Sequence, residues 1–207
     1  MNALDYLKDP CGASSLPYWK TEQIIIPGSI TVFRDDEFIA AHCIGTDEPY
    51  FKLVHHLQHI ERPDLTGSFE MIDCGIADYA RHIDECYAVE GVTYEELRSY
   101  MDHPVYDPDL WIAVQDPING RIVATGIAET DTRIGEGILE WIQVSPDYRR
   151  RGLGKYIVCE LLRRMKDKAG FVTVSGKVNN PCSSFSLYRS CGFVDPVIWH
   201  VVTGGVI

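Results

Sequence analysis

The segment from residue 136 to residue 170 constrains the fold of this chain more than any other. It reads EGILEWIQVSPDYRRRGLGKYIVCELLRRMKDKAG, in which a strand-like apolar run ends at Val144 and a helical pattern begins after Gly152. The second part has an apolar face that consists of Leu153, Tyr156, Ile157, Val158, Leu161, Leu162 and Met165. A helix of this kind buries its apolar face, so we expect a strand, a tight turn and a helix that packs on a sheet.

Strand and helix patterns of similar quality lie on both sides of this segment. Pro, Gly and polar residues gather in ERPDLTGS, residues 61–68, which predicts a linker. We therefore expect an N-terminal extension over residues 1–66 and a main domain over residues 67–207. The extension is predicted to form strand, turn and strand over residues 30–45 and a short helix over residues 49–61. The main domain is predicted to contain a hairpin over residues 110–130 and four further strands, at 69–74, 137–144, 171–178 and 197–204. Its predicted helices are 76–89, 93–101, 152–170 and 181–192. The order predicts a mixed α+β fold.

The charge balance and the cysteines limit the classes of partner. There are 30 acidic and 19 basic residues and a formal net charge of -11, which disfavours binding to nucleic acid and favours a cationic small partner. The 7 cysteines contain no CxxC pair, so neither a disulfide framework nor a zinc ribbon is indicated. The first residues lack a signal-peptide pattern, and no run of eighteen apolar residues occurs. The sequence predicts a cytoplasmic protein without a membrane segment.

The turn before the long helix is predicted to bind an anion. Three consecutive arginines, Arg149 to Arg151, repel one another unless something negative lies near them. Backbone N–H groups at the start of the helix have no intrahelical partner, and glycines at 152 and 154 let a phosphate approach them. Arg149 and Tyr156 exclude a P-loop, and Ile157 stands where a dinucleotide-binding fingerprint needs a small residue.

Two motifs make the sequence resemble the GNAT family of acyltransferases. Residues 149–154, RRRGLG, match the R/Q-x-x-G-x-G/A signature of that family, and residues 187–193, LYRSCGF, resemble its later L-Y-x-x-x-G-F motif. The resemblance covers residues from about 69 to 207. It implies a central, mostly antiparallel, twisted sheet flanked by helices, with residues 1–66 as a short N-terminal appendage.

The resemblance also implies acetyl-CoA as the co-substrate and no metal. The pyrophosphate is then expected on the amides of residues 149–154, and the pantetheine arm along the backbone of residues 142–144. Asn180 stands one residue further from Tyr188 than the corresponding asparagine of many members. The expected cofactor-binding residues are Ile142, Gln143, Val144, Arg149, Arg150, Arg151, Gly152, Leu153, Gly154, Lys155 and Asn180.

Acyl transfer to an amine requires a base and a proton donor. Strand alternation predicts that Glu140 and Val144 share one face of their strand, which makes Glu140 the expected base, with Glu136 or a water molecule as the alternative. Tyr188 matches the position of the family's general acid. The expected reaction is direct attack of the amine in a ternary complex.

More than one acceptor and more than one assembly are compatible with the sequence. A small molecule, a protein N-terminus and a lysine side chain are all candidate acceptors, and the chain is expected to be a monomer or a homodimer. A module that binds acyl-CoA without turnover is the alternative function. His55 and His59 in HHLQH have the i, i+4 spacing of zinc ligands on a helix, but no carboxylate or thiol pattern completes the set. Residues 1–66 are expected to cap the acceptor pocket.

Overall fold

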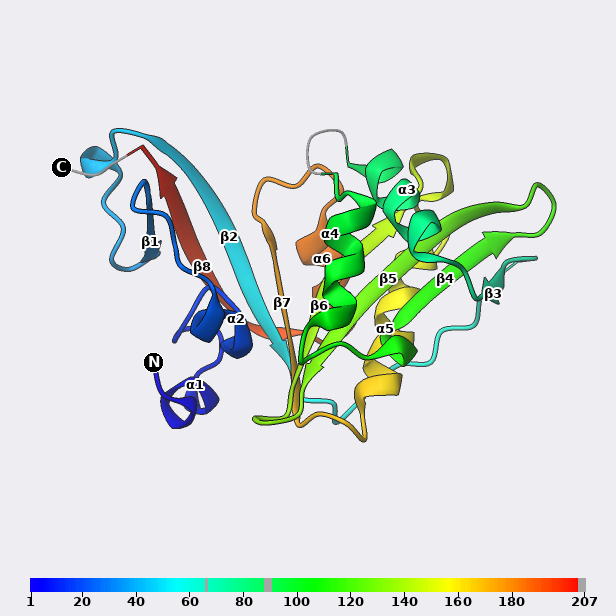
Figure 1. Ribbon diagram of the computed structural model, residues 1–207, viewed down its shortest axis with the longest axis horizontal. Coiled ribbons are helices and arrows are strands. Elements are labelled where there is room, and N and C mark those ends of the chain that lie inside the picture. The colour runs from blue at the N-terminus through cyan, green and yellow to red at the C-terminus, as the bar shows by residue number, and fades with distance from the viewer. Residues whose placement is uncertain (66, 88–90, 205–207) are drawn as a thin grey trace. The chain divides into compact units, whose positions relative to one another are not determined.

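The computed structural model describes residues 1–65, 67–87 and 91–204 and has the expected mixed α+β fold (Figure 1). Two compact units make up the chain: the first consists of Met1–His56 and Thr173–Ile207, and the second of Leu57–Val172. In the described parts the strands number eight, and their sheet is mostly antiparallel, as predicted. No helix in those parts has the length and apolar character needed to cross a membrane.

The second unit contains four antiparallel strands in the order β6-β5-β4-β3. They are β3 (Glu70–Ile72), β4 (Trp111–Asp116), β5 (Arg121–Asp131) and β6 (Glu136–Val144). Its helices are α3 (Ile76–Cys86), α4 (Tyr94–Ser99) and α5 (Leu153–Met165), with the 3-10 turns η2 (Tyr100–Asp102), η3 (Pro108–Leu110) and η4 (Pro146–Tyr148). The sequence places all these strands and α-helices correctly, although residues 88 and 89, the predicted end of α3, lie outside the described residues.

Helices cover both faces of these strands. On one face α5 lies against β5 and β6, and a Cβ atom on Gly126 would be 2.4 Å from Cγ2 of Ile157. On the other face α3 and α4 enclose a buried cluster that includes Tyr79, Ile83 and Ile127. The apolar stripes of the helices thus account for the layered arrangement.

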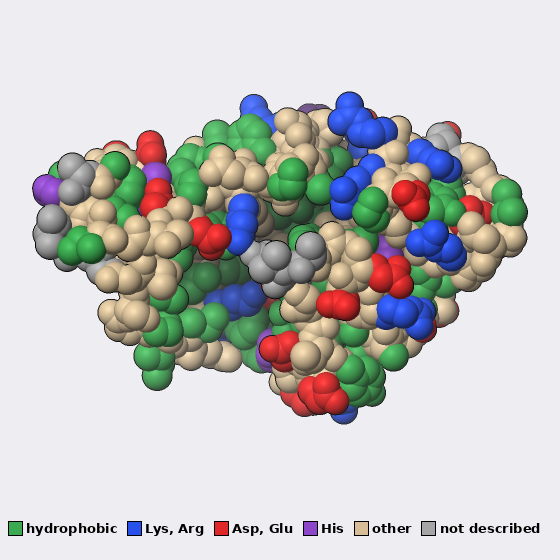
Figure 2. Space-filling view, turned by 90° about the horizontal axis from the view of Figure 1, so that it is seen from above, with side chains coloured by type: hydrophobic (Ala, Val, Ile, Leu, Met, Phe, Trp, Pro, Cys, Tyr) green, Lys and Arg blue, Asp and Glu red, His purple; other side chains and the backbone are tan. Residues whose placement is uncertain are grey.

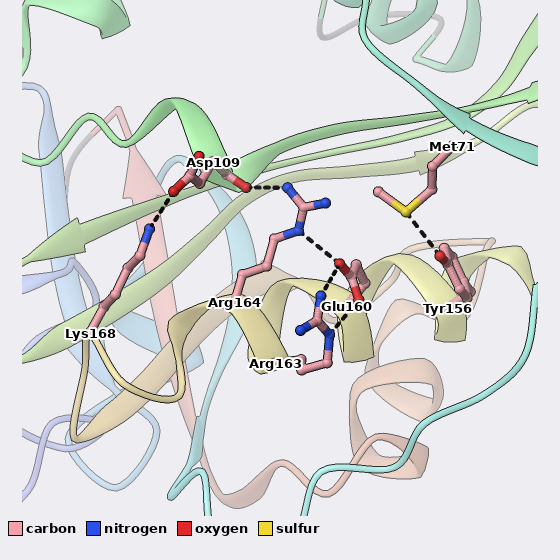
Figure 3. A network of polar contacts seen from close by, with 7 residues as sticks. All are labelled: Met71, Asp109, Tyr156, Glu160, Arg163, Arg164 and Lys168. Atoms are coloured by element: carbon pink, nitrogen blue, oxygen red, sulfur yellow. Dashed lines mark hydrogen bonds and ion pairs between the residues drawn. The ribbon is translucent and has the colours of Figure 1, made fainter.

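Polar contacts fix α5 on its outer side (Figure 3). The Tyr156 hydroxyl donates to Sδ of Met71 at 2.9 Å, and Nη1 of Arg164 donates to the carbonyl oxygen of Asp109 at 2.6 Å. Burial alone would raise the pKa of Glu160, but hydrogen bonds from Arg163 and Arg164 outweigh it and hold this pKa below its ordinary value. The helix that begins at the predicted anion site is therefore held along its length.

The first unit contains the antiparallel strands β1 (Ile30–Arg34), β8 (Val194–Thr203) and β2 (Thr46–His55), in that order. Strand β7 (Phe171–Lys177) begins in the second unit and continues into the first. The helices of the first unit are α1 (Ala3–Lys8), α2 (Tyr18–Gln23) and α6 (Ser184–Ser190), with the 3-10 turn η1 (Ala40–His42).

A buried lysine holds the N-terminal residues against β2. Nζ of Lys52 donates to the hydroxyl of Tyr6 at 2.9 Å and to the carbonyl oxygens of Ser14 and Leu16 at 3.0 and 2.7 Å. The Lys52 side chain is only 1% exposed. Hydrogen bonds to a buried ammonium group are strong, so the lysine fixes the loop between α1 and α2.

Two predictions for the N-terminal residues are wrong. The stretch from 49 to 61 is not a helix, because Thr46–His55 is a strand. Residues 51–55 of that strand are all buried, so it lacks the alternation of a half-exposed strand. The second predicted strand of the 30–45 segment is instead η1, Ala40–His42.

The two compact units do not coincide with the predicted division of the chain at residue 66. Residue 66 itself lies outside the described residues, and the second unit begins at Leu57. The N-terminal strands pair with β8, near the other end of the sequence. That residues 1–66 form an extension distinct from a domain over residues 67–207 stays a prediction.

We expect Lys52→Met to release the N-terminal residues, because the Tyr6 hydroxyl and the partly buried carbonyl groups of Ser14 and Leu16 lose their donor. The cost is about 2 kcal/mol of unfolding free energy. Limited trypsin digestion should cut faster at Lys8 and Lys20, whereas Lys166→Met, at an exposed lysine, should not change either rate. Equal digestion rates in wild type and Lys52→Met would show that Lys52 does not hold this segment.

Candidate functional site

The predicted anion-binding turn has the backbone conformation that an N-terminal helix site requires. Residue Arg150 has φ 65° and Gly152, the N-cap of α5, has φ 82°, so the chain reverses between η4 and the helix through two left-handed residues. No atom lies within 4 Å of the position that a Cβ on Gly152 would occupy, apart from its chain neighbours. The approach to the backbone at this point is open.

Several amides at this turn are available to a ligand. Within the described parts of the chain, the N–H groups of Arg150, Gly152, Leu153 and Gly154 have no backbone acceptor. They lie at the positive end of the dipole of α5, which is 13 residues long. Such a set of N–H groups can bind a phosphate or another anion.

Each of the three arginines has a different environment. Nε of Arg149 donates to the carbonyl oxygen of Val144 at 3.2 Å, at the end of β6. Nη2 of Arg151 donates to the carbonyl oxygen of Asp147 at 3.2 Å, and its Cζ lies 4.9 Å from the ring centroid of Tyr148. Arg150 is exposed to solvent. Arg149 and Arg151 thus have local acceptors, and the charge of Arg150 is solvated.

At the end of β6, the backbone N–H and C=O groups of two residues point to the strand edge that faces away from β5. The Ser145 amide donates to the carbonyl oxygen of Val123 at 2.9 Å, so Gln143 lies in the next hydrogen-bonded pair with β5. The backbone groups of Ile142 and Val144 therefore point away from β5. The hydroxyl of Tyr87 donates to the carbonyl oxygen of Ile142 at 3.4 Å, on that same edge.

A β-bulge lies at Glu140. Leu139 pairs with Ala128 and Trp141 pairs with Ile127, so Glu140 is the additional residue between them. A bulge redirects the side chain of the extra residue and is frequent near functional sites. Glu140 is half-buried and lies at this distortion of β6. In the sequence it stands between Glu136 and residues 142–144, along which the pantetheine arm is predicted to lie.

The bulge overturns the alternation argument for these residues. The register places Glu136 on the same face as Trp141 and Gln143, toward α3, whereas Val144 lies on the face toward α5. Glu136 is completely buried, with 0% exposure. Alternation therefore does not place Glu140, Val144 and Glu136 on one face, because it fails wherever a bulge adds a residue.

The first unit contains two of the predicted site residues. Tyr188 lies in α6, is 7% exposed, and its ring centroid is 5.7 Å from that of Phe193 and 6.1 Å from that of Phe51. Oδ1 of Asn180 accepts a hydrogen bond from the amide of Cys182 at 2.8 Å. Asn180 thus stabilises the loop that precedes α6. The roles of Asn180 and Tyr188 stay predictions.

The three histidines of HHLQH do not lie on a helix, so the spacing argument for zinc does not apply. His55 is buried at the end of β2, with its ring centroid 5.3 Å from that of Phe193. Nε2 of His56 is 3.7 Å from Oδ2 of Asp195, and His59 is exposed.

A buried histidine that the sequence did not single out joins α3 to the predicted cofactor site. Nδ1 of His82 lies 2.9 Å from Oγ1 of Thr125 on β5, and Nε2 lies 2.9 Å from Oγ of Ser145, directly after β6. The side-chain amide of Gln143 also donates to Oγ1 of Thr125. The position of His82 on the apolar face of its helix, next to Ile83, was the available signal.

Comparison with known families finds a match for part of the chain. Residues 107–195 match the family model described as an acetyltransferase (GNAT) domain. No curated protein matches the chain. The resemblance that the two sequence motifs carry is confirmed by the family model.

Solved structures with a similar fold include the following three proteins. A GCN5-related N-acetyltransferase from Sphaerobacter thermophilus is 18% identical with a TM-score of 0.59, over 75% of this chain and 51% of that chain. An acetyltransferase of the GNAT family from Colwellia psychrerythraea is 12% identical with a TM-score of 0.61, over 89% and 69%. Ard1 from Thermoplasma volcanium is 15% identical with a TM-score of 0.52, over 66% and 99%.

These likenesses show the fold, because all three sequences are less than one-fifth identical to this chain. The chain spans about half the length of the Sphaerobacter thermophilus protein, 51% of it. The predicted sheet and its flanking helices are thereby confirmed.

We expect His82 to make the protein less stable in weak acid. Burial, together with the charges of Arg121 and Arg81, lowers the pKa of His82 from 6.5 to about 4. Between these values the unfolded chain binds a proton that the folded chain does not, so stability falls as pH decreases from 6.5 to about 4, by up to about 3 kcal/mol.

Urea unfolding of wild type and His82→Gln at several pH values between 4.5 and 7 measures this contribution. The stability difference between the two proteins should shrink as pH falls. The exposed His59 gives the control variant, His59→Gln, whose stability should follow that of wild type. Parallel pH curves for wild type and His82→Gln would contradict a buried neutral imidazole.

Proposed function

We propose, on the premise that residues 107–195 belong to a GNAT acetyltransferase domain, that this protein transfers an acetyl group from acetyl-CoA to an amine. The family match supports acyl transfer in general. The observation that carries the finer proposal is the turn at the start of α5, where unpaired amides surround an open glycine in the left-handed conformation. A pyrophosphate is an anion of the size and charge that such a turn binds.

Two neighbouring elements would hold acetyl-CoA. Arg150, Gly152, Leu153 and Gly154 offer amides to the pyrophosphate, and Arg149 and Arg151 add positive charge close to it. Lys155, the next residue of the helix, forms an ion pair with Glu61 at 2.6 Å and is the further proposed contact. The outward-facing backbone of Ile142 and Val144 can pair with the two amide groups of the pantetheine arm. Gln143 directs its backbone toward β5 and contributes by fixing that strand end. Asn180 is a further proposed contact.

The proposed reaction is a direct attack in a ternary complex. The amine nitrogen forms a bond to the thioester carbonyl carbon, and the carbon–sulfur bond then breaks. Glu140, directly or through water, takes the proton that the amine loses, and Tyr188 gives the proton that the departing thiolate gains. Glu136 is the less suitable base because it is completely buried on the α3 face.

The acceptor is proposed to be a cationic amine. A formal net charge of -11 favours the encounter with a positively charged molecule, whether a small amine, a protein N-terminus or a lysine side chain. All seven cysteines are free thiols, which fits a reducing, cytoplasmic environment. We propose that the protein acts as a monomer or a homodimer.

We expect Gly152→Val to weaken acetyl-CoA binding by at least about tenfold, about 1.4 kcal/mol, in a titration calorimeter. A branched side chain is strained at a positive φ and covers the amides that would meet the phosphates. Gly28→Val is the matched control, because a Cβ there also meets nothing within 4 Å and lies outside the turn. Unchanged affinity in folded Gly152→Val would exclude this turn as the pyrophosphate site.

The catalytic residues have separable kinetic signatures. Tyr188→Phe keeps the ring, so loss of the general acid should lower kcat by about 100-fold with little change in acetyl-CoA affinity. Glu140→Gln should lose most rate at neutral pH, where the amine is mainly protonated, and regain part of it as pH rises. Thiol release at saturating substrates, with chemistry limiting, measures both effects.

A variant at an exposed tyrosine controls for the loss of a hydroxyl group. Tyr94, on α4, is 48% exposed, and Tyr94→Phe should retain wild-type kcat. Full activity of Glu140→Gln at every pH would move the base to Glu136 or water. Full activity of Tyr188→Phe would likewise exclude Tyr188 as the general acid. If the wild-type protein binds acetyl-CoA but releases no thiol with any amine, a non-catalytic acyl-CoA-binding module becomes the better account.

A further inference from the structure

The second unit has a cavity of about 500 Å³ that the proposed acyl transfer does not use. It lies where the start of α3 meets the β4–β5 hairpin, and its wall includes Asp73, Glu85, Arg121, Ile72 and Ile122. The register places Glu140 beside Ile127, five residues along β5 from Ile122. At the rise of a β-strand, Ile122 is therefore roughly 17 Å from Ile127 along β5. The wall also includes His82, which contacts Ser145 directly after β6, so the cavity adjoins the predicted cofactor turn.

Charged groups of both signs line the cavity, and some lack a partner. Asp78 is occupied, because it accepts from the amide of Gly75 at 3.2 Å and from Nη2 of Arg81 at 2.6 Å. In contrast, Asp73, Glu85 and Arg121 form no ion pair with any residue in the described ranges. Two carboxylates and one guanidinium are therefore available to a ligand.

The guanidinium of Arg121 has a defined position at the cavity wall. Its Cζ lies 5.9 Å from the ring centroid of Tyr148. The hydroxyl of Tyr148 donates to Oδ2 of Asp116 at 2.9 Å and accepts from Nδ2 of Asn119 at 2.8 Å. The aromatic ring is thus fixed against the hairpin turn. The guanidinium of Arg121, at an exposed position beside this ring, can pair with a planar carboxylate.

The remaining wall combines the Asp78–Arg81 ion pair, His82 and Gln115 with a smaller apolar part. Ile72 and Ile122 are partly exposed and offer an aliphatic surface between the charged groups. Burial raises the pKa of the Cys74 thiol, also on the wall, to about 11, so the sulfur stays neutral. The volume lies within the range of small-molecule sites. Figure 2 shows that acidic and basic side chains are interspersed over this unit, rather than gathered in a patch of one sign.

We propose that this cavity binds a free amino acid with a cationic side chain. The α-carboxylate of the ligand pairs with Arg121, and its two cationic groups pair with Asp73 and Glu85. The methylene groups lie against Ile72 and Ile122. The ligand thus offers one anionic and two cationic groups, which match the one guanidinium and the two carboxylates that form no ion pair. A diamine lacks the anionic group, and an amino acid with an uncharged side chain lacks one of the cationic groups. The proposal does not depend on acetyl-CoA binding.

Calorimetric titration of the full chain with L-lysine, without acetyl-CoA, tests the proposal. We expect saturable binding of one L-lysine per chain. Cadaverine lacks the carboxylate and L-norleucine lacks the side-chain ammonium, so each should bind at least about tenfold more weakly. Arg121→Gln and Glu85→Gln should each weaken L-lysine binding at least about fivefold. The matched controls Arg98→Gln and Glu95→Gln, at exposed positions of α4, should bind like wild type.

Three results would overturn the proposal. The first is absence of saturable L-lysine binding, and the second is equal affinity for cadaverine, which would indicate recognition of amines alone. The third is L-lysine binding that is unchanged in Arg121→Gln and Asp73→Asn but lost in Glu140→Gln. That result would place L-lysine at the acceptor site instead. Circular dichroism and thermal unfolding establish that each variant is folded. If Glu85→Gln is not folded, Asp73→Asn replaces it in the titration.

Discussion

The close contact between α5 and the strands β5 and β6 is the constraint on which the rest of the second unit depends. Two glycines make it possible: a Cβ on Gly126 would be 2.4 Å from Cγ2 of Ile157, and one on Gly137 would be 2.6 Å from Sδ of Met165. The contacts lie about two turns apart, at Ile157 in the first half of the helix and at Met165, its last residue, so they fix its axis as well as its distance from the sheet. The start of the helix, and with it the open amides after Arg149, has a defined place beside the end of β6.

The electrostatics of the proposed site follow from this arrangement. The chain as a whole is acidic, with a net charge of -11, yet the turn presents N–H groups, a helix dipole and three arginines. On the opposite face, His82 links α3 through Thr125 to β5 and through Ser145 to the end of β6. A neutral, buried imidazole makes this link without adding another charge beside the arginines. The strand end is therefore supported from both faces.

The sequence predicted the elements of the second unit because each has a clear period and clear boundaries. It predicted the turn because glycine and arginine have specific backbone and charge properties there. It misplaced β2 because residues 51–55 are buried throughout and show no alternation. The bulge at Glu140 depends on pairing with Ile127 and Ala128, which local sequence does not encode. The partners of His82 come from 43 and 63 residues away, so no local pattern reveals them.

The central claim is that acetyl-CoA binds where β6 ends and α5 begins. Titration of ¹⁵N-labelled protein with acetyl-CoA, followed by amide chemical shifts, tests it most directly because each backbone N–H group reports separately. The account predicts the largest shifts at residues 150–154, with further shifts at Ile142 and Val144, whose amides face away from β5. Binding that leaves these amides unchanged and shifts amides elsewhere would contradict it.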